Sequence, residues 1–283
     1  MRVYKSNREL INELDQSLFN PAKLSNSLAL LYQETSKLDK FSMMQLGENI
    51  GLFSVPYVSQ RASQPYKCYP QSKSINMDDY KGKKQTAGSL FDILSKRRSV
   101  RKFADYELSM GELYSILHYA YGVTSEQEME GGAYSWALRT VPSAGALYPL
   151  ELYLFVNRAA IQNGLYHYRA DTESLELVDK HLSLDSVRDC VVTEPYIQMS
   201  DSCCLLFITS VAERVLLKYG ERGYRFMIQE VGATTQNVSL VCYELGLGSC
   251  IVGGFLDDKI NNLLDVDGTL ETIQSVVVIG KAS

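Results

Sequence analysis

The chain has 283 residues, of which 46% are hydrophobic and 22% charged, so it can form one large or two modest globular domains. This composition excludes a wholly disordered or fibrous protein. The net charge of −5 disfavours a protein that binds nucleic acid through its own charge.

The sequence predicts neither a targeting segment nor a structural metal site. The N-terminal stretch carries charges every few positions, unlike the apolar core of a signal peptide, and no segment reaches the ~20 uncharged apolar residues of a membrane span. The six cysteines form no CxxC pair, and the three histidines have no ligand spacing. We therefore expect a cytoplasmic protein with reduced, mostly buried thiols.

The N-terminal third predicts helices followed by a linker. Residues 5–40 carry apolar side chains at helical spacing. From Pro56 to about Gly88 this periodicity ends, and the Pro-, Gly-, Ser- and Lys-rich sequence predicts an irregular linker that wraps the body. We expect an N-terminal helical region with its polar linker at 1–88, and a second domain at 89–283.

Helices and strands are interleaved in the second domain. One helix is predicted at 89–98 with Ser89 as its cap, and another begins at Ser109 and ends at Gly122. The remaining elements are a polar loop at 124–139, a strand at 150–156, a hairpin from 164–170 and 174–179, a buried strand at 202–211, a long helix at 225–246, and a final strand at 272–280. This order predicts an α+β domain of three layers.

A cluster of cations follows the first of these helices. Arg97, Arg98, Arg101 and Lys102 surround Ser99 in the stretch KRRSVRKF. Arginine guanidinium groups bind phosphate oxygens bidentately, so this cluster suits a phosphate. The alternative is a solvated basic helix end that the helix dipole favours.

Two loops of small residues precede or follow buried segments. The first comprises Pro142, Ser143, Ala144 and Gly145, and its small side chains let backbone N–H groups approach a flat ligand closely. The second, GLGSCIVGGF at 246–255, leaves a helix rather than opening one, so it is not a dinucleotide-binding GxGxxG turn. The alternatives are a plain turn and a helix C-cap, respectively.

Lys218 and Tyr219 end an apolar stretch. A lysine whose pKa is lowered by partial burial can act as a general base, and a tyrosine can donate a proton or orient the lysine. The alternative is a polar segment that precedes a helix. No Ser-His-Asp or Cys-His set can be assembled from the three histidines.

The order and spacing of these motifs resemble those of one family. The stretches RRSVRKF, PSAGALYPLELY, KYGERGYR, QEVGATTQNVSLVCYELGLGSCIVGGF and VVVIGK resemble the nitroreductase-like flavoproteins, and more narrowly the SagB-type dehydrogenases, over roughly residues 89–281. LYQETSK at 31–37 is similar to an N-terminal motif of the SagB-type proteins, with Gln33 where those proteins usually carry His.

The resemblance implies a fold and a cofactor. The implied fold is α+β and three-layered, with a central mixed, mostly antiparallel sheet flanked by helices, and the implied assembly is a homodimer with FMN at the subunit interface, where each site draws on both chains. The residues that match cofactor contacts are Arg97, Arg98, Ser99 and Arg101 (phosphate, ribityl chain and pyrimidine edge), Pro142, Ser143, Ala144 and Gly145 (against the isoalloxazine ring), Gly253 and Gly254 (near flavin N5 and O4), Gln236, and Lys281.

The resemblance also implies a reaction. Lys218 and Tyr219 match the Lys-Tyr pair of the azoline-oxidising branch, which plain nitroreductases lack. That branch oxidises thiazoline or oxazoline rings of a ribosomally synthesised, modified peptide to thiazoles or oxazoles. Lys218 would remove the azoline Cα proton as a hydride leaves for flavin N5, and Tyr219 would stabilise developing charge or orient the lysine.

The implied partners are an azoline-containing precursor peptide and a cyclodehydratase, with residues 5–40 and 56–88 as candidate contacts. Two alternatives stay open. One is a NAD(P)H-dependent nitroreductase or quinone reductase with the same flavin. The other is a flavin-free scaffold subunit, against which the arginine cluster and the glycine-rich turns argue.

Overall fold

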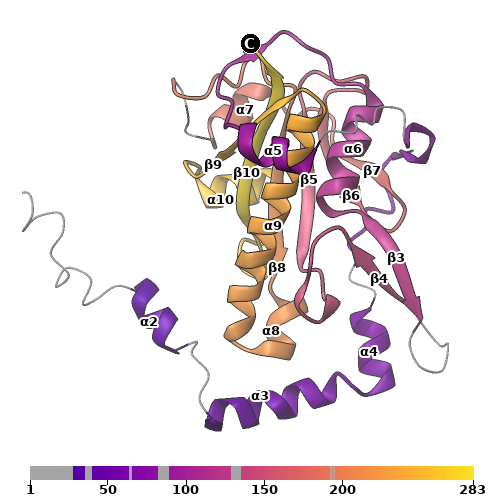
Figure 1. The fold of residues 1–283 in the computed structure, drawn as a ribbon, viewed down its shortest axis with the longest axis vertical. Helices are drawn as coiled ribbons and strands as arrows, with labels where there is room; N and C mark the ends of the chain where they lie inside the picture. Colours follow the sequence, from indigo (N-terminus) through magenta and orange to yellow (C-terminus); the bar gives the residue numbers. More distant parts are fainter. Residues whose placement is uncertain are drawn as a thin grey trace, which may run out of the picture. The chain divides into compact units, whose positions relative to one another are not determined.

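The computed structural model describes residues 28–35, 40–63, 66–81, 89–128, 135–191, 193 and 195–283. The chain divides into two compact units, Met1–Gln45 and Leu46–Ser283. Helix α2 (Leu28–Thr35) lies in the first unit and agrees with part of the helical spacing predicted over 5–40, whose first two thirds fall outside the described residues. The second unit holds the sheet and every candidate site residue (Figure 1).

Eight strands form the central sheet. They are β1 (Ser74–Asn76), β2 (Phe103–Ala104), β5 (Leu150–Val156), β6 (Gly164–Arg169), β7 (Ser174–Asp179), β8 (Cys204–Val211), β9 (Gly248–Val252) and β10 (Glu271–Ala282). Their order is β1-β7-β6-β5-β8-β10-β2, and β9 also pairs with β10. All of these pairs are antiparallel, and one isolated parallel bridge joins Leu108 to Ala159.

The second unit also holds helices and two short 3-10 turns. Their bounds are α3 (Lys40–Leu52, which begins in the first unit), α4 (Pro56–Ala62), η2 (Asp78–Tyr80), α5 (Leu90–Lys96), α6 (Met110–Tyr121), η3 (Ala144–Ala146), α7 (Leu184–Arg188), α8 (Glu213–Tyr219), α9 (Arg222–Glu244) and α10 (Asp257–Leu263). Among the described residues, none of the helices has the length and apolar content that crossing a membrane requires.

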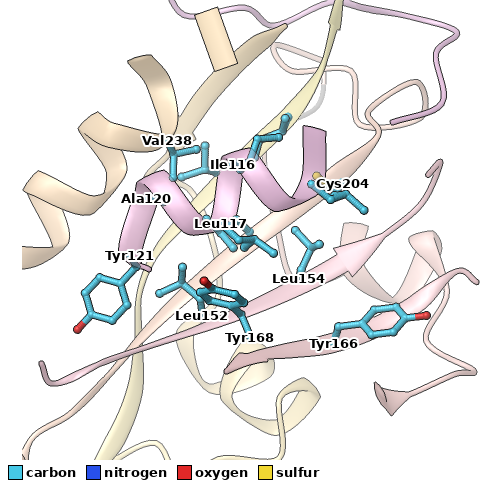
Figure 2. Close-up of a cluster of buried hydrophobic side chains, with 14 of the residues drawn as sticks. Ile116, Leu117, Ala120, Tyr121, Leu152, Leu154, Tyr166, Tyr168, Cys204 and Val238 are labelled. Atoms are coloured by element: carbon cyan, nitrogen blue, oxygen red, sulfur yellow. The ribbon is translucent and has the colours of Figure 1, made fainter. Parts of the chain in front are cut away.

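Helices α6 and α9 cover one face of the sheet. Figure 2 shows Leu117 of α6 close to Leu152 and Leu154 of β5, and Ile116 of α6 close to Val238 of α9, all of them buried. Strand β5 is buried on both faces, so its sequence is nearly all apolar, with the buried Glu151 as the exception. This apolar run made β5 predictable from the sequence.

Helices α7 and α10 cover the opposite face. Val187 of α7 and Ile260 of α10 belong to a second buried cluster with Tyr153, Phe155 and Phe207. Tyr153 and Phe155 alternate along β5 with the residues that face α6. The predicted three-layer α+β architecture is therefore confirmed.

Two predictions of irregular structure were wrong. The segment predicted as a polar loop at 124–139 contains a hairpin of β3 (Val123–Glu128) and β4 (Ser135–Arg139), with its tip outside the described residues. Strand β3 is exposed at all but its first position, so it shows no apolar alternation. The linker predicted from Pro56 contains α4 and β1, and α4 has a proline in its first turn.

Candidate active site

The loop at 142–145 and the Lys-Tyr pair meet at one point. Gly145 has a φ of +63°, and a Cβ built there would lie 2.5 Å from Tyr219 Oη and 2.8 Å from Lys218 Nζ. Two motifs far apart in the sequence are thus in direct contact. A side chain at position 145 would displace the ends of Lys218 and Tyr219, so glycine is the residue that leaves both groups in place.

The loop backbone is held in an uncommon conformation. Besides Gly145, Ala146 has a φ of +52° and Tyr148 a φ of +44°. Two hydrogen bonds secure the loop: Arg139 N donates to Tyr148 Oη at 2.9 Å, and Tyr148 N donates to Ser143 Oγ at 2.9 Å. Left-handed non-glycine residues cost about 1–2 kcal/mol each, so their presence indicates that surrounding contacts fix the loop.

A buried carboxyl group lies beneath this loop. Glu230 of α9 is 3% exposed and accepts a hydrogen bond from Tyr121 Oη at 2.6 Å. Burial raises the pKa of Glu230 to about 7, although hydrogen bonds from Ser143 and Tyr121 favour its charged form. The guanidinium of Arg139 is also nearby, 4.4 Å from the centre of the Tyr121 ring. Glu230 therefore connects α9 to the loop through Ser143.

The Lys-Tyr pair occupies a partly buried, aromatic environment at the end of α8. Lys218 Nζ lies 5.2 Å from the centre of the Phe53 ring and 5.3 Å from that of Tyr219. The Tyr219 ring in turn meets Phe226 edge-on at 5.1 Å. Burial lowers the pKa of Lys218 and raises that of Tyr219. A lysine with a lowered pKa is more readily the neutral amine that accepts a proton.

The cluster of cations at residues 97–102, which we call the arginine segment, runs beside β9. Val100 N donates to the carbonyl of Ser249 at 3.0 Å, and the carbonyl of Arg101 accepts from Gln198 N at 2.9 Å. Within the described part of the chain, neither Arg97 nor Arg101 makes an ion pair. These two cations are therefore available to an anion, which fits a phosphate group.

Arg98 and Ser99 differ from their neighbours. Arg98 Nη1 donates to the carbonyls of Ser95 and Arg97 at 3.0 and 2.8 Å, so Arg98 closes the end of α5. This contact agrees with the alternative interpretation of a basic helix end. Ser99 is exposed.

The two glycines at 253 and 254 and Lys281 lie at different levels of β10, because Val252, which precedes the glycines, pairs with Val276, whereas Gly248 pairs with Gly280 next to Lys281. Gly253 and Gly254 directly follow β9 and are exposed, and no atom of the described residues lies within 4 Å of a Cβ built at Gly253. Lys281 pairs with Ala104 of β2, close after the arginine segment. Arg97, Arg101 and Lys281 form a set of cations at one end of the sheet that fits the phosphate of FMN, and the exposed glycines farther along β10 leave space for a flat ring. Gln236 is exposed on α9.

The predicted site residues of one chain form two separate sets. Figure 1 shows α5 and the C-terminus at one end of the sheet and α8 at the other. The arginine segment lies at the level of Ile279 on β10, because Val100 bonds Ser249 and Ser249 pairs with Ile279. The loop at 142–145 leads into β5, whose first residue, Leu150, pairs with Ser210 of β8. Ser210 in turn pairs with Thr272 of β10. At ~3.3 Å per strand residue, the two levels are roughly 20 Å apart along β10.

Two residues of the site were missed from the sequence. Glu230 comes three residues after Met227, so helical spacing places both on the buried face of α9. A charged residue on a buried face is uncommon, and the sequence alone could have indicated Glu230 as a candidate for the site. Phe53 precedes α4 in a stretch without apolar periodicity, and no signal there pointed to contact with Lys218.

Comparison with known proteins places the fold and the family. The model of the nitroreductase family matches residues 94–281. A Methanocaldococcus jannaschii protein named after the nitroreductases is 37% identical over 183 residues, which cover 62% of this chain and 84% of that protein.

Two further matches concern peptide processing. The microcin B17-processing protein McbC of Escherichia coli is 29% identical over 137 residues, 46% of this chain and 49% of McbC, so the chain spans about half of that relative. The solved structure of the E. coli microcin synthetase McbBCD complex with truncated pro-MccB17 bound aligns with a TM-score of 0.54 at 20% identity, covering 87% of this chain and 98% of the matched chain. The chain therefore belongs to the nitroreductase family of flavin-dependent oxidoreductases.

Proposed function

We propose that this protein is an FMN-dependent azoline dehydrogenase that converts thiazoline or oxazoline rings of a ribosomally synthesised peptide to thiazoles or oxazoles. One observation carries the proposal: Tyr219 Oη and Lys218 Nζ lie 2.5 and 2.8 Å from the position that a Cβ would take on Gly145. Gly145 belongs to the loop that we expect to contact the flavin ring. A base and a hydroxyl there are suited to removing a proton from a bound ring.

The similarity to McbC supports a peptide as the substrate. McbC is named for the processing of microcin B17, and the McbBCD complex was solved with truncated pro-MccB17 bound. We extend this to a precursor peptide carrying azoline rings, and to a cyclodehydratase that forms those rings and works beside this protein.

Two parts of the chain would hold FMN: the arginine segment and the turn that contains Gly253 and Gly254. Arg97, Arg98, Ser99 and Arg101 would hold the phosphate, ribityl chain and pyrimidine edge, with Lys281 and Gln236 as further contacts. Gly253 and Gly254 would leave room for the flavin ring. Bound FMN supplies the acceptor for the hydride that the azoline ring loses.

The chain's own residues handle the proton. Lys218, as the neutral amine, takes the proton from the azoline Cα, and its lowered pKa increases the fraction in that form. Tyr219 keeps its own proton because burial raises its pKa, so it can orient the lysine or donate a hydrogen bond to the ring. Phe53 shields the amine from bulk water.

The separation of the two residue sets supports a homodimer. The arginine segment and the loop at 142–145 lie at opposite ends of the sheet, roughly 20 Å apart along β10. We propose that one FMN contacts the arginine segment of one subunit and the loop of its partner. Lys218 and Tyr219 then come from the same subunit as that loop.

Replacement of Lys218 tests the proposed role. With the FMN-loaded dimer and a thiazoline peptide, Lys218→Ala should lower kcat at least ~100-fold, as expected for loss of a general base, while bound FMN stays unchanged. Lys259→Ala, which removes an exposed lysine of α10, serves as the matched control and should keep full turnover. Ring oxidation is followed by mass spectrometry and flavin content by visible absorbance. Full turnover by Lys218→Ala would contradict the assignment.

The higher identity to the M. jannaschii protein favours a second candidate, a NAD(P)H-dependent nitroreductase or quinone reductase. An anaerobic absorbance experiment separates the two. Bleaching of the flavin by a thiazoline peptide alone supports the dehydrogenase, whereas bleaching by NADPH alone supports the reductase. In the second case Lys218 has no assigned task.

A further inference from the structure

A groove of about 310 Å³ lies between α4 and α8, next to the Lys-Tyr pair. We call it the α4–α8 groove. Its apolar lining includes Phe53, Leu147 and Leu217, and its polar lining includes Arg61 of α4 and Glu213 of α8. The mechanism above uses none of these residues except Phe53. Helix α4 also lies outside the stretch that the family model matches.

The groove is adjacent to the reacting position. The Phe53 ring lines the groove and also lies 5.2 Å from Lys218 Nζ. Leu147 follows the loop at 142–145 by two residues, and Leu217 directly precedes Lys218. A ring bound at Lys218 therefore has the groove beside it, at the position of the next peptide residue.

The lining has the chemistry of a site for one peptide residue. Leu217 is 67% exposed, and together with Phe53 and Leu147 it gives the groove a contiguous apolar surface. Arg61 and Glu213 are both exposed, and neither side chain makes an ion pair or hydrogen bond with another described residue. One free donor and one free acceptor match the carbonyl and the N–H of a peptide backbone.

We infer that the α4–α8 groove binds the residue next to the azoline ring and selects an apolar side chain at that position. The inference rests on the proposed function. The apolar side chain packs on Leu217, Phe53 and Leu147, while Arg61 and Glu213 bind the main chain. The groove thereby sets which rings of a peptide with several rings are oxidised.

Peptides that differ only beside the ring test the inference in the FMN-loaded enzyme. We compare thiazoline peptides with Gly, Leu or Asp next to the ring, on each side in turn. At one of the two positions that flank the ring, the wild type should oxidise the Leu peptide with a kcat/KM roughly tenfold above that of the Gly peptide. This is the usual effect of filling an apolar pocket. Leu217→Ser should reduce this preference to less than about threefold and leave the Gly peptide unaffected.

The matched control is Leu270→Ser, which removes an exposed leucine that does not line the groove. This variant should keep the wild-type preference. A wild type that is indifferent to the neighbouring residue, or a Leu217→Ser variant that keeps the preference, would overturn the inference.

A binding measurement separates failure of the inference from failure of the proposed function. Fluorescently labelled peptides that already carry the thiazole need no turnover, and their anisotropy should show tighter binding for Leu than for Gly in the wild type only. If this difference is found but no thiazoline peptide is oxidised, the groove assignment holds and the dehydrogenase proposal fails. If thiazoline peptides are oxidised but the Leu and Gly peptides bind equally well, the dehydrogenase proposal holds and the groove assignment fails.

Discussion

Gly145 is the residue whose environment links the loop to the Lys-Tyr pair. In Gly145→Ala, the new Cβ would overlap the ends of two flexible side chains, Lys218 and Tyr219, rather than backbone. The fold should survive with a loss of about 1–2 kcal/mol for the left-handed backbone, while the displaced pair lowers kcat by about 100-fold. Urea unfolding and ring-oxidation kinetics measure the two effects separately.

Gly268→Ala is the control for this variant, because Gly268 also has a positive φ, of +73°, but lies away from the Lys-Tyr pair. It should lose comparable stability and retain turnover. If both variants lost turnover equally, backbone strain rather than displacement of the pair would explain the effect of Gly145→Ala.

Glu230 predicts a pH-dependent contribution to stability. Its pKa of about 7 exceeds the ordinary value of 4.5, so the unfolded chain releases the proton first as the pH rises between these values. The contribution of Glu230 is therefore fully present below pH 4.5 and is lost as the pH rises through about 7, by up to roughly 3 kcal/mol. Glu230→Gln removes this loss, because the amide does not ionise.

The expected result is that Glu230→Gln gains stability relative to the wild type between about pH 5 and pH 8. Urea unfolding of both proteins at the two pH values measures the difference. A difference that stays constant with pH would mean that Glu230 remains charged throughout, held so by its hydrogen bonds from Ser143 and Tyr121.

At the scale of single elements, helix α6 depends on a capping box. Ser109 Oγ accepts from Glu112 N, and the Glu112 carboxylate accepts from Ser109 N at 2.9 Å. Ser109→Ala should cost about 1 kcal/mol of unfolding free energy. Ser89, the cap of α5, makes no such side-chain bond, so Ser89→Ala should cost less than about 0.5 kcal/mol. Equal losses in urea unfolding would argue against the capping box.

The elements that the sequence predicted well have contiguous buried faces. Strands β5, β8 and β10 are mostly apolar, helices α6 and α9 each bury a continuous face, and all five lie close to the positions predicted. The hairpin of β3 and β4 and helix α4 were missed because few of their residues are buried: β3 is exposed beyond its first position, β4 is mostly half-buried, and Ser59 is the buried residue of α4. Elements without a buried face carry no apolar periodicity from which the sequence could predict them.

A different limit applies to the site. The sequence predicted the loop at 142–145 and the Lys-Tyr pair separately, but not their contact at Gly145, which depends on how α8 packs. The roles of all these residues remain predictions. The contact of Phe53 with Lys218 could not be predicted, because nothing local indicates which residue of an irregular stretch will meet a distant helix.

At the scale of the whole molecule, a site shared between subunits predicts complementation. Arg101→Ala should impair FMN binding and Lys218→Ala should impair proton removal, so each homodimer is inactive. In a mixed dimer, one site receives both altered residues and the other receives neither. Equal co-expression should therefore restore about a quarter of wild-type turnover, measured on the purified mixture. If each site came from a single chain, no mixture would recover activity.

Strand β10 extends from the level of α8 to the level of the arginine segment, with one register shift between Ile273 and Ser275. It pairs with β8 on one side and, over its second half, with β9 and then β2 on the other. The stretch 276–279 is paired on both sides, so it resists bending, and we expect its amide hydrogens to exchange slowly. The centre of the sheet is therefore its stiffest part. We expect a motion that opens a path to Lys218 to come from the short helix α4 and from Phe53 before it.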